Sequence, residues 1–338
     1  MQRSAIRKFP WWILTSIQLF SSPLPHKAAA AEKLTGVYSA QSISMSLPWI
    51  AQESGLFRKY NLDFQLIYIP SGPAVTVAML GGDAGVSVGG GAAIVRAVVQ
   101  GATDFVFIGS VKNAFTTSIV AGQKIKALTD LKGKKLGVSR IGSSTHYFAI
   151  LALRRVGLDP TRDVTFIQAG GELERLAALM NGSVDAATLT PPTDARAIAQ
   201  GFNYLAYGPD LHVPYASVIL VSRRSLIAKQ PLVVGQFMRV MAEAAKLLHT
   251  NKEFVFKVLQ KHLRVEDRKL LEASYDGEIK VLEPKLDIKL EALQAMIDEV
   301  SQTDPRAKAV LPQDLTDRRY LDDMEKTGFF AKLWSDKK

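Results

Sequence analysis

The sequence predicts an α/β protein built from two lobes. Its 338 residues are too many for one small core. From Leu34 to about Tyr207, short apolar runs alternate with segments of helical period, which is typical of sheets with mainly parallel strands. One plan of strands, helices and loops also occurs twice in this region. We therefore expect a structural duplication.

Each copy of the plan runs in the order strand, loop, helix, strand, helix, strand, loop and helix. In the first copy we expect these elements at about 34–38, 39–44, 47–60, 64–68, 73–80, 85–88, 89–91 and from Ala92. In the second copy we expect them at about 135–139, 142–145, 145–156, 164–168, 172–180, 186–189, 190–192 and from Asp194. Glycines follow several helices in both copies, as left-handed C-caps require. Any α/β chain has such glycines, but here the element order agrees as well.

After Ser217 the pattern changes to one strand followed by helices. The strand is expected at 217–222, and the helices at about 231–248, 252–262, 266–281 and 288–300. The first of these helices carries an apolar stripe formed by Val233, Phe237, Val240, Met241, Ala244, Leu247 and Leu248. Such a stripe indicates packing against the rest of the protein.

Residues 1–31 predict an export signal. They hold four basic residues and no acidic one, and an apolar stretch over 11–20 precedes the small residues 28–31. A membrane-spanning helix needs about 20 apolar residues, more than this stretch offers. We expect cleavage before Glu32 and release into a periplasm-like compartment, with an uncleaved anchor as the alternative. Loss of the four basic residues lowers the formal net charge from +10 to +6.

Composition and motifs exclude several classes of function. The chain has no cysteine, which excludes disulfides, thiolate metal sites, a cysteine nucleophile and a lipid anchor on an N-terminal cysteine. Its basic residues are spread out, so we expect no nucleic-acid partner. No pair of histidines has metal-ligand spacing, and we expect neither metal nor cofactor. Ser87 lies in a GxSxG pattern but within a strand-like run, so we expect no catalytic residue.

Four loops are candidates for a ligand site, at 42–46, 89–92, 142–145 and 190–192. Each ends at a predicted helix N-terminus, whose first N–H groups lack partners, and ligands of open sheets bind at the carboxyl ends of strands. Small residues let an anion reach those groups, while Ser and Thr hydroxyls add neutral donors. The loops therefore predict an anion clamp without a basic residue. For any single loop, plain helix capping is the alternative.

Several segments resemble one family of transport proteins. Pro48-Trp49-Ile50-Ala51 precedes Gly55-Leu56-Phe57 and Leu62-Asp63, and later segments match in order at 89–93, 130–138, 142–145 and 184–187. In these segments the chain resembles the periplasmic substrate-binding proteins for nitrate, sulfonate and taurine import. This SsuA-like group also resembles the thiamine-pyrimidine synthases. The most specific part is DLKGKKLGV at 130–138 followed by GSST at 142–145.

The resemblance implies a type II periplasmic-binding-protein fold, with two α/β lobes, a central cleft and a helical C-terminal region. It implies a signal at 1–31, lobe 1 at 32–115, lobe 2 at 116–216 and a return to lobe 1 over 217–338, with crossings near 115–120 and 215–219. Ligand contacts carried over by position fall on Ser42, Ser44, Gly90, Gly91, Ala92, Ser143, Ser144, Thr145 and Thr190.

Three further residues have two interpretations each. Tyr215, beside the second crossing, lines the cleft or packs in the core. Arg140 approaches the cleft or stays at the surface. Asp194 receives a ligand amine or caps a helix.

The function implied by the resemblance is the extracytoplasmic binding component of an ABC importer, and not an enzyme. Such a protein captures a small anionic organic molecule of the sulfonate, nitrate or aromatic carboxylate class between its lobes. It delivers the ligand to a membrane permease with its ATPase. We expect a periplasmic monomer. The alternatives are a sensor or accessory protein without transport, and a binding protein or enzyme for thiamine-pyrimidine precursors.

Overall fold

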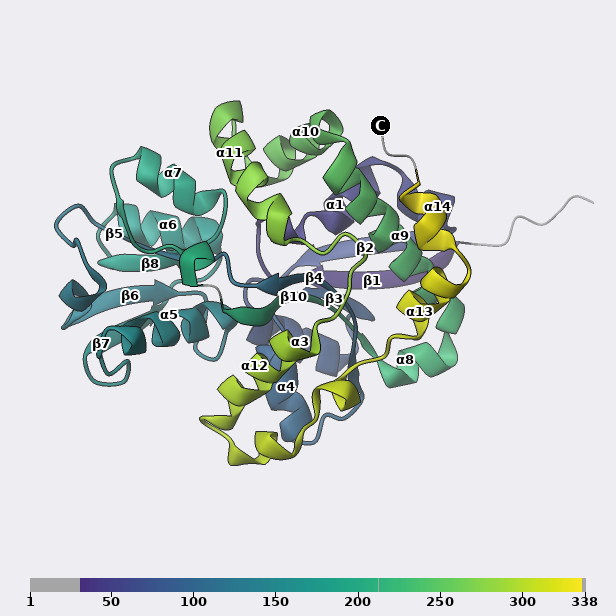
Figure 1. The fold of residues 1–338 in the computed structure, drawn as a ribbon, viewed down its shortest axis with the longest axis horizontal. Helices are drawn as coiled ribbons and strands as arrows, with labels where there is room; N and C mark the ends of the chain where they lie inside the picture. Colours follow the sequence, from purple (N-terminus) through teal and green to yellow (C-terminus); the bar gives the residue numbers. More distant parts are fainter. Residues whose placement is uncertain (1–30, 212, 336–338) are drawn as a thin grey trace, which may run out of the picture. The chain divides into compact units, whose positions relative to one another are not determined.

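The computed structural model describes residues 31–211 and 213–335. Apart from Ala31, the predicted export signal at 1–31 lies outside these residues. The described residues contain two five-stranded sheets, with helices on the faces of both (Figure 1). Within this part of the chain, no helix combines the length and the apolar character needed to cross a bilayer.

The strand order of the first sheet is β2-β1-β3-β10-β4, and that of the second is β7-β6-β8-β5-β9. The first sheet consists of β1 (Glu32–Tyr38), β2 (Leu62–Tyr68), β3 (Val86–Gly89), β4 (Phe105–Ala114) and β10 (Pro214–Arg223). The second sheet consists of β5 (Ser118–Ala121), β6 (Lys134–Val138), β7 (Val164–Gln168), β8 (Ala186–Leu189) and β9 (Asn203–Ala206).

The two sheets repeat one arrangement. Position by position, β2, β1, β3, β10 and β4 correspond to β7, β6, β8, β5 and β9. The predicted duplication is therefore confirmed. The first three strands of each sheet are parallel, but β10 and β5 are antiparallel to both neighbours. Four of the five strands in each sheet run in one direction, as predicted, and each sheet is mixed because the strand that enters it from the other sheet runs against its neighbours.

The chain passes between the sheets twice. It leaves the first sheet between β4 and β5, and it returns between β9 and β10. The first passage lies at the start of the expected crossing at 115–120. The second precedes the one expected at 215–219, because β10 already begins at Pro214. The lobe boundaries themselves stay a prediction.

The helices of the repeated part follow the expected plan with one break. They are α1 (Leu47–Glu53), α2 (Leu56–Lys59), α3 (Gly72–Gly81), α4 (Ala92–Val99), α5 (Ser144–Arg155), α6 (Glu172–Met180) and α7 (Thr193–Ala199). The helix predicted over 47–60 is split into α1 and α2 because Gly55 has a left-handed backbone with φ 75°. Figure 1 shows α6 and α7 on one side of the second sheet and α5 on the other.

The C-terminal part is helical, as predicted. It contains α8 (Arg224–Lys229), α9 (Pro231–Thr250), α10 (Lys252–Leu263), α11 (Arg268–Glu278), α12 (Leu290–Ser301), α13 (Arg319–Lys326) and α14 (Phe329–Leu333). Short 3-10 turns lie at η1 (Ile43–Met45), η2 (Leu128–Leu131), η3 (Gly208–Leu211), η4 (Ile279–Val281), η5 (Pro305–Ala309) and η6 (Pro312–Leu315). The predicted stripe of α9 is buried except for the half-buried Leu247.

Candidate functional site

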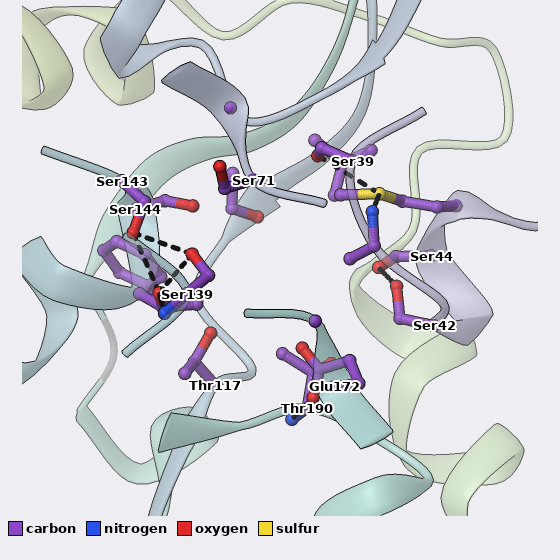
Figure 2. A pocket seen from close by; sticks show the side chains of 18 of the residues that line it. Ser39, Ser42, Ser44, Ser71, Thr117, Ser139, Ser143, Ser144, Glu172 and Thr190 are labelled. Carbon is purple, nitrogen blue, oxygen red and sulfur yellow. Dashed lines mark hydrogen bonds between the residues drawn. The ribbon is translucent and has the colours of Figure 1, made fainter. Parts of the chain in front are cut away.

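A cavity lies where the carboxyl ends of strands from both sheets meet (Figure 2). Ser39 follows β1, Ser139 follows β6 and Thr190 follows β8, and all three line it. It holds about 570 Å³ of atom-free space, part of which is open to solvent. This is the edge at which open α/β sheets bind their ligands.

Hydroxyl groups dominate the cavity wall, so we call it the hydroxyl cavity. Eleven of its twenty lining residues are Ser or Thr: Ser39, Ser42, Ser44, Ser71, Thr117, Ser139, Ser143, Ser144, Thr145, Thr190 and Ser217. Among the other lining residues, only Lys112, Glu172 and Arg175 are charged. Hydroxyls rotate to donate or to accept, so the wall suits an oxygen-rich ligand without a strong fixed field.

Six of the ten residues predicted to contact ligand line this cavity: Ser42, Ser44, Ser143, Ser144, Thr145 and Thr190. They come from three of the four predicted loops. The structure thus brings together loops that are far apart in the sequence. Their contact with a ligand stays a prediction.

The fourth loop, at 89–92, contributes none of the lining residues. A Cβ atom on Gly91 would lie 2.1 Å from Cδ1 of Ile219, so Gly91 faces the packed interior. Ala92 is buried at the start of α4. A Cβ atom on Gly90 would lie 2.9 Å from Oγ of Ser144. The missing side chain of Gly90 therefore allows the close approach of a cavity-lining serine.

Tyr215, Arg140 and Asp194 do not line the hydroxyl cavity. The Tyr215 hydroxyl donates to Oε2 of Glu299 at 2.7 Å, and its ring stacks on Phe115 with centroids 4.2 Å apart. Burial and the Glu299 carboxylate raise the pKa of Tyr215. The structure thus places Tyr215 in the core, Arg140 at the exposed surface and Asp194 in the interior, in the first turn of α7.

Many of the hydroxyls are bonded to one another. Oγ of Ser139 bonds to Oγ of Ser143 at 2.9 Å and to Oγ1 of Thr145 at 3.0 Å. Ser143 also caps α5 by accepting from the backbone N–H of His146. Across the cavity, Ser42 and Ser44 bond at 3.2 Å (Figure 2). These contacts fix the orientation of the loops before any ligand enters.

Other hydroxyls at the cavity have no partner. Oγ of Ser71 and Oγ1 of Thr190 are buried without a hydrogen bond. Oγ of Ser144, a half-buried residue, also has no hydrogen bond with the described residues. A buried polar group left unpaired costs about 1–3 kcal/mol, and a ligand that pairs with it recovers that energy. Since Ser71 follows a strand of the first sheet and Thr190 one of the second, such a ligand contacts both sheets.

Three helices of eight residues or more begin at the cavity, and two of them were not among the predicted ligand loops. Ser71 precedes α3, Ser143 precedes α5 and Gly171 precedes α6. Helices were expected at about 73–80 and 172–180, directly after Ser71-Gly72 and Gly170-Gly171, so the sequence did contain the signal. Their first N–H groups are oriented for an anion.

The cation at α6 is paired within the protein and uses three of its five N–H donors. Arg175 is buried and donates from Nε to the carbonyl oxygen of Thr188 at 2.6 Å and from Nη1 to that of Gly170 at 2.6 Å. Its Nη2 donates to Oε1 of Glu172, whose Oε2 accepts from the backbone N–H of Thr190 at 3.1 Å. This pair positions the Gly170–Glu172 turn and Thr190, and it leaves no net charge for a ligand.

The second cation has one donor to spare. Nζ of Lys112, in β4, donates to Oγ1 of Thr116 at 2.5 Å and to Oε1 of Glu278 at 2.7 Å. An ammonium group has three N–H donors, so one remains for a ligand. Sequence reasoning missed Lys112 because it lies within a strand that was not predicted, away from any loop or helix start.

Two titratable groups near the cavity stay neutral. Burial and the neighbouring Glu174 and Glu172 raise the pKa of Tyr68, whose unpartnered hydroxyl lies over Gly171. Burial and Arg96 lower the pKa of His146 to about 4, and its Nδ1 accepts from the N–H of Gly142 at 3.2 Å. The neutral imidazole thereby holds the 142–145 loop without adding charge.

The two mixed sheets and the cavity between them define a periplasmic-binding-protein fold. Residues 46–253 match the family described as NMT1/THI5 like, and the chain belongs to this family. A protein of Brucella abortus that is named as a binding protein is 28% identical over 247 residues, which cover 71% of this chain and 74% of the relative. The predicted fold and the resemblance to the SsuA-like group are confirmed.

Solved structures share the fold at low identity. One is a protein of Bordetella bronchiseptica RB50, with a TM-score of 0.78 and 20% identity over 87% of this chain and 98% of the other. The alkanesulfonate-binding protein SsuA of Xanthomonas axonopodis pv. citri, bound to MOPS, has a TM-score of 0.72 and 22% identity over 86% and 100%. The desulfurization enzyme DSZB has a TM-score of 0.65 and 14% identity over 88% and 99%.

The fold is therefore shared by binding proteins and by at least one enzyme. A further structure of DSZB is that of a mutant in which serine replaces a cysteine, in complex with biphenyl-2-sulfinic acid. The present chain has no cysteine at any position, so no chemistry that needs a thiol is open to it. Ser87, from the GxSxG pattern, is buried within β3 and not on a turn.

Proposed function

We propose that the protein is an extracytoplasmic solute-binding protein that captures a small organic monoanion in the hydroxyl cavity. It presents the ligand-bound form to a membrane ABC permease with its ATPase, and it catalyses no reaction. Ser42, Ser44, Ser71, Ser144 and Thr190 contact the ligand together with Lys112. Gly90 permits the approach of Ser144.

One observation carries this proposal: buried, unpartnered hydroxyls from both sheets face one cavity. An oxyanion that accepts from Ser71 and Thr190 at once is held only while the two sheets stay together. Ligand binding therefore favours the closed arrangement. Arg175 is neutralised by Glu172 and Lys112 by Glu278, so the cavity favours one negative charge over two.

The names of similar proteins support the ligand class. SsuA of Xanthomonas binds alkanesulfonates, and a sulfonate offers three acceptor oxygens in a small volume. Nitrate, taurine and aromatic carboxylates share the planar or tetrahedral oxyanion that hydroxyls and helix N–H groups recognise. A periplasmic location is part of the proposal, and it is supported by the predicted export signal and by the likeness to the periplasmic SsuA of Escherichia coli.

Isothermal titration and thermal unfolding with a ligand panel test the proposal. The panel contains ethanesulfonate, taurine, nitrate, benzoate and a hydroxymethyl-aminopyrimidine. We expect at least one oxyanion to bind and to raise the melting temperature, since a ligand that binds only the folded state stabilises it. Stabilisation by the pyrimidine alone would favour the thiamine-precursor alternative, and no stabilisation by any member would refute the proposal. Loss of uptake on gene deletion separates transport from sensing.

A further inference from the structure

A second cavity lies beside the hydroxyl cavity and shares none of its lining residues. It holds about 640 Å³ of atom-free space, part of it open to solvent. One wall is formed by Asp194 of α7 with Tyr204 and Tyr207 at and after β9. The other wall is formed by Ser274, Gly277 and Glu278 of α11. Because two carboxylates and, among the residues that the structure describes, no basic side chain line it, we call it the acidic cavity.

Asp194 is a buried carboxylate without an ion-pair partner among the described residues. It is 1% exposed, and its Oδ2 accepts from the hydroxyls of Ser118 at 3.1 Å and Tyr204 at 3.2 Å. Its Oδ1 accepts from the N–H of Ala195 at 2.8 Å. Neutral donors alone do not compensate a buried charge, and this burial raises the pKa of Asp194 to about 7.

Glu278 also lines this cavity and carries an unsatisfied oxygen. The residue is 2% exposed, and its Oε1 accepts from Lys112 and Thr116. Its Oε2 is buried and has no partner. One turn earlier on α11, Oγ of Ser274 is also buried without a hydrogen bond. Two residues that line the cavity from one helix thus each hold a buried, unpaired polar atom, which indicates that a donor belongs beside them.

The mouth of the cavity is aromatic. The rings of Tyr204 and Tyr207 lie with centroids 5.2 Å apart at an interplanar angle of 60°, and the residues are 36% and 38% exposed. Aromatic faces attract cations. Asp194, Asp210 and Glu278 all contribute negative charge at the Tyr207 hydroxyl and raise its pKa together with burial. The field at the mouth is therefore negative.

We propose that the acidic cavity is a second binding site, specific for a small organic ammonium ion that carries N–H groups. The ammonium donates to Oε2 of Glu278 and to Asp194, and its carbon chain packs against Tyr204 and Tyr207. A metal ion fits less well, because the described residues contain no group of three His, Cys, Asp or Glu side chains able to hold one. Of the two interpretations of Asp194, this site corresponds to a ligand amine.

The chain offers a way to close the cavity without disturbing its walls. No atom lies within 4 Å of a Cβ built on Gly277, and this glycine has ordinary helical φ in α11. A larger side chain at this position enters empty space. Gly277→Leu should therefore add bulk at the cavity wall without a clash while it raises the helix propensity of the position.

Titration of the full chain with n-butylammonium chloride tests the proposal, with n-butanol and sodium chloride as matched controls. We expect saturable millimolar binding of butylammonium and none of the controls. Gly277→Leu and Asp194→Asn should each weaken it by about tenfold or more, as loss of space or of a charged acceptor does. Ser144→Ala, in the hydroxyl cavity, should leave it unchanged. Thermal unfolding checks that each variant is folded.

Absence of saturable butylammonium binding, equal binding of butanol, or full binding by folded Gly277→Leu would overturn the proposal. If Gly277→Leu does not fold, the nearly isosteric Asp194→Asn decides alone: retained affinity refutes the site. None of these outcomes depends on an anion in the hydroxyl cavity. Failure here is therefore distinguishable from failure of the proposed solute-binding function.

Discussion

The hydroxyl cavity and the acidic cavity share one ion pair but differ in the atoms that they leave unpaired. Lys112 lines the first, Glu278 lines the second, and the two side chains meet at 2.7 Å. The first cavity leaves hydroxyls of Ser71 and Thr190 unpaired, and the second leaves a carboxylate oxygen of Glu278. In the two proposals, the sign of the charge on each ligand thus rests on the unpaired atoms of its own cavity. It does not follow from the net charge of the chain, which is +10.

The shared pair also joins the strand core to the C-terminal helices. Lys112 lies in β4 and Glu278 at the end of α11, and their side chains are only 4% and 1% exposed. Removing two charges from water is costly, and close pairing offsets that cost only while both partners remain. Removing one partner of the Lys112–Glu278 pair is therefore the strongest test of whether the two cavities share this buried wall.

The largest effect is expected from Lys112→Met. It leaves the Glu278 carboxylate buried and uncompensated, so we expect a loss of about 3–5 kcal/mol in the free energy of unfolding. Urea denaturation measures this. The double variant Lys112→Met, Glu278→Leu removes both charges and should recover most of the stability, while it loses butylammonium affinity. A single-variant loss below about 1 kcal/mol, as for exposed pairs, would show that the cavities do not share a buried wall.

The pH dependence of stability distinguishes the two cavities next. Burial raises the pKa of Asp194 from 3.8 to about 7, and the nearby Glu172 carboxylate adds to the increase. Between these values the folded state holds a proton that the unfolded state has lost. Protonated Asp194 contributes fully to the free energy of unfolding below the unfolded pKa. This contribution is lost as the pH rises to about 7, by up to about 1.4 kcal/mol per pH unit.

Asp194→Asn removes this titration. Urea denaturation of wild type and variant at several values between pH 5 and pH 8 should therefore show the variant gaining relative to wild type as pH rises. Saturating butylammonium should reduce the difference, since it favours the ionised Asp194. Parallel stability curves for the two proteins would contradict the assignment of an unpaired, buried carboxylate.

Much of the fold was predictable because its signals are local. Apolar alternation, helix starts and C-capping glycines gave the repeated plan, and the identical strand order of the two sheets bears it out. The strands β4, β5 and β9 were not predicted. β4 is buried along nearly its whole length, so it lacks the alternation of a half-exposed strand. β5 and β9 are four residues long each and lie outside the repeated plan that revealed the equally short β3 and β8.

The cavity walls were predictable only where loops form them. The sequence alone shows that three of the wall residues follow strands and precede helices, namely Ser143, Ser144 and Thr190. Lys112 and Glu278 are separated by 166 positions, and nothing local indicates their contact. The acidic cavity was missed for the same reason, because its walls come from α7, β9 and α11.

Two threonines, Thr188 on β8 and Thr190 directly after it, sharpen the assignment of the hydroxyl cavity. Oγ1 of Thr190 is unpartnered, whereas Oγ1 of Thr188 donates to the carbonyl oxygen of Gly137 at 3.1 Å. We expect Thr190→Val to weaken the best-bound oxyanion by about 1 kcal/mol or more and to leave stability unchanged or raised. Thr188→Val should lower stability by about 1 kcal/mol and leave affinity unchanged. Ligand titration and urea denaturation of both variants measure affinity and stability. If the two variants change affinity and stability in the same way, the assignment of Thr190 to the ligand site is refuted.

The smallest effects are expected at the start of α5, where adjacent serines differ in role. Ser143 caps the helix, so Ser143→Ala should lower the free energy of unfolding by about 1 kcal/mol. The hydroxyl of Ser144 lies close to Gly90 and makes no hydrogen bond with the described residues. Ser144→Ala should therefore change stability by less than about 0.5 kcal/mol and weaken the oxyanion by about fivefold. If Ser144→Ala instead loses stability and keeps its affinity, the hydroxyl belongs to the scaffold, and the ligand in this cavity is held without the 142–145 loop.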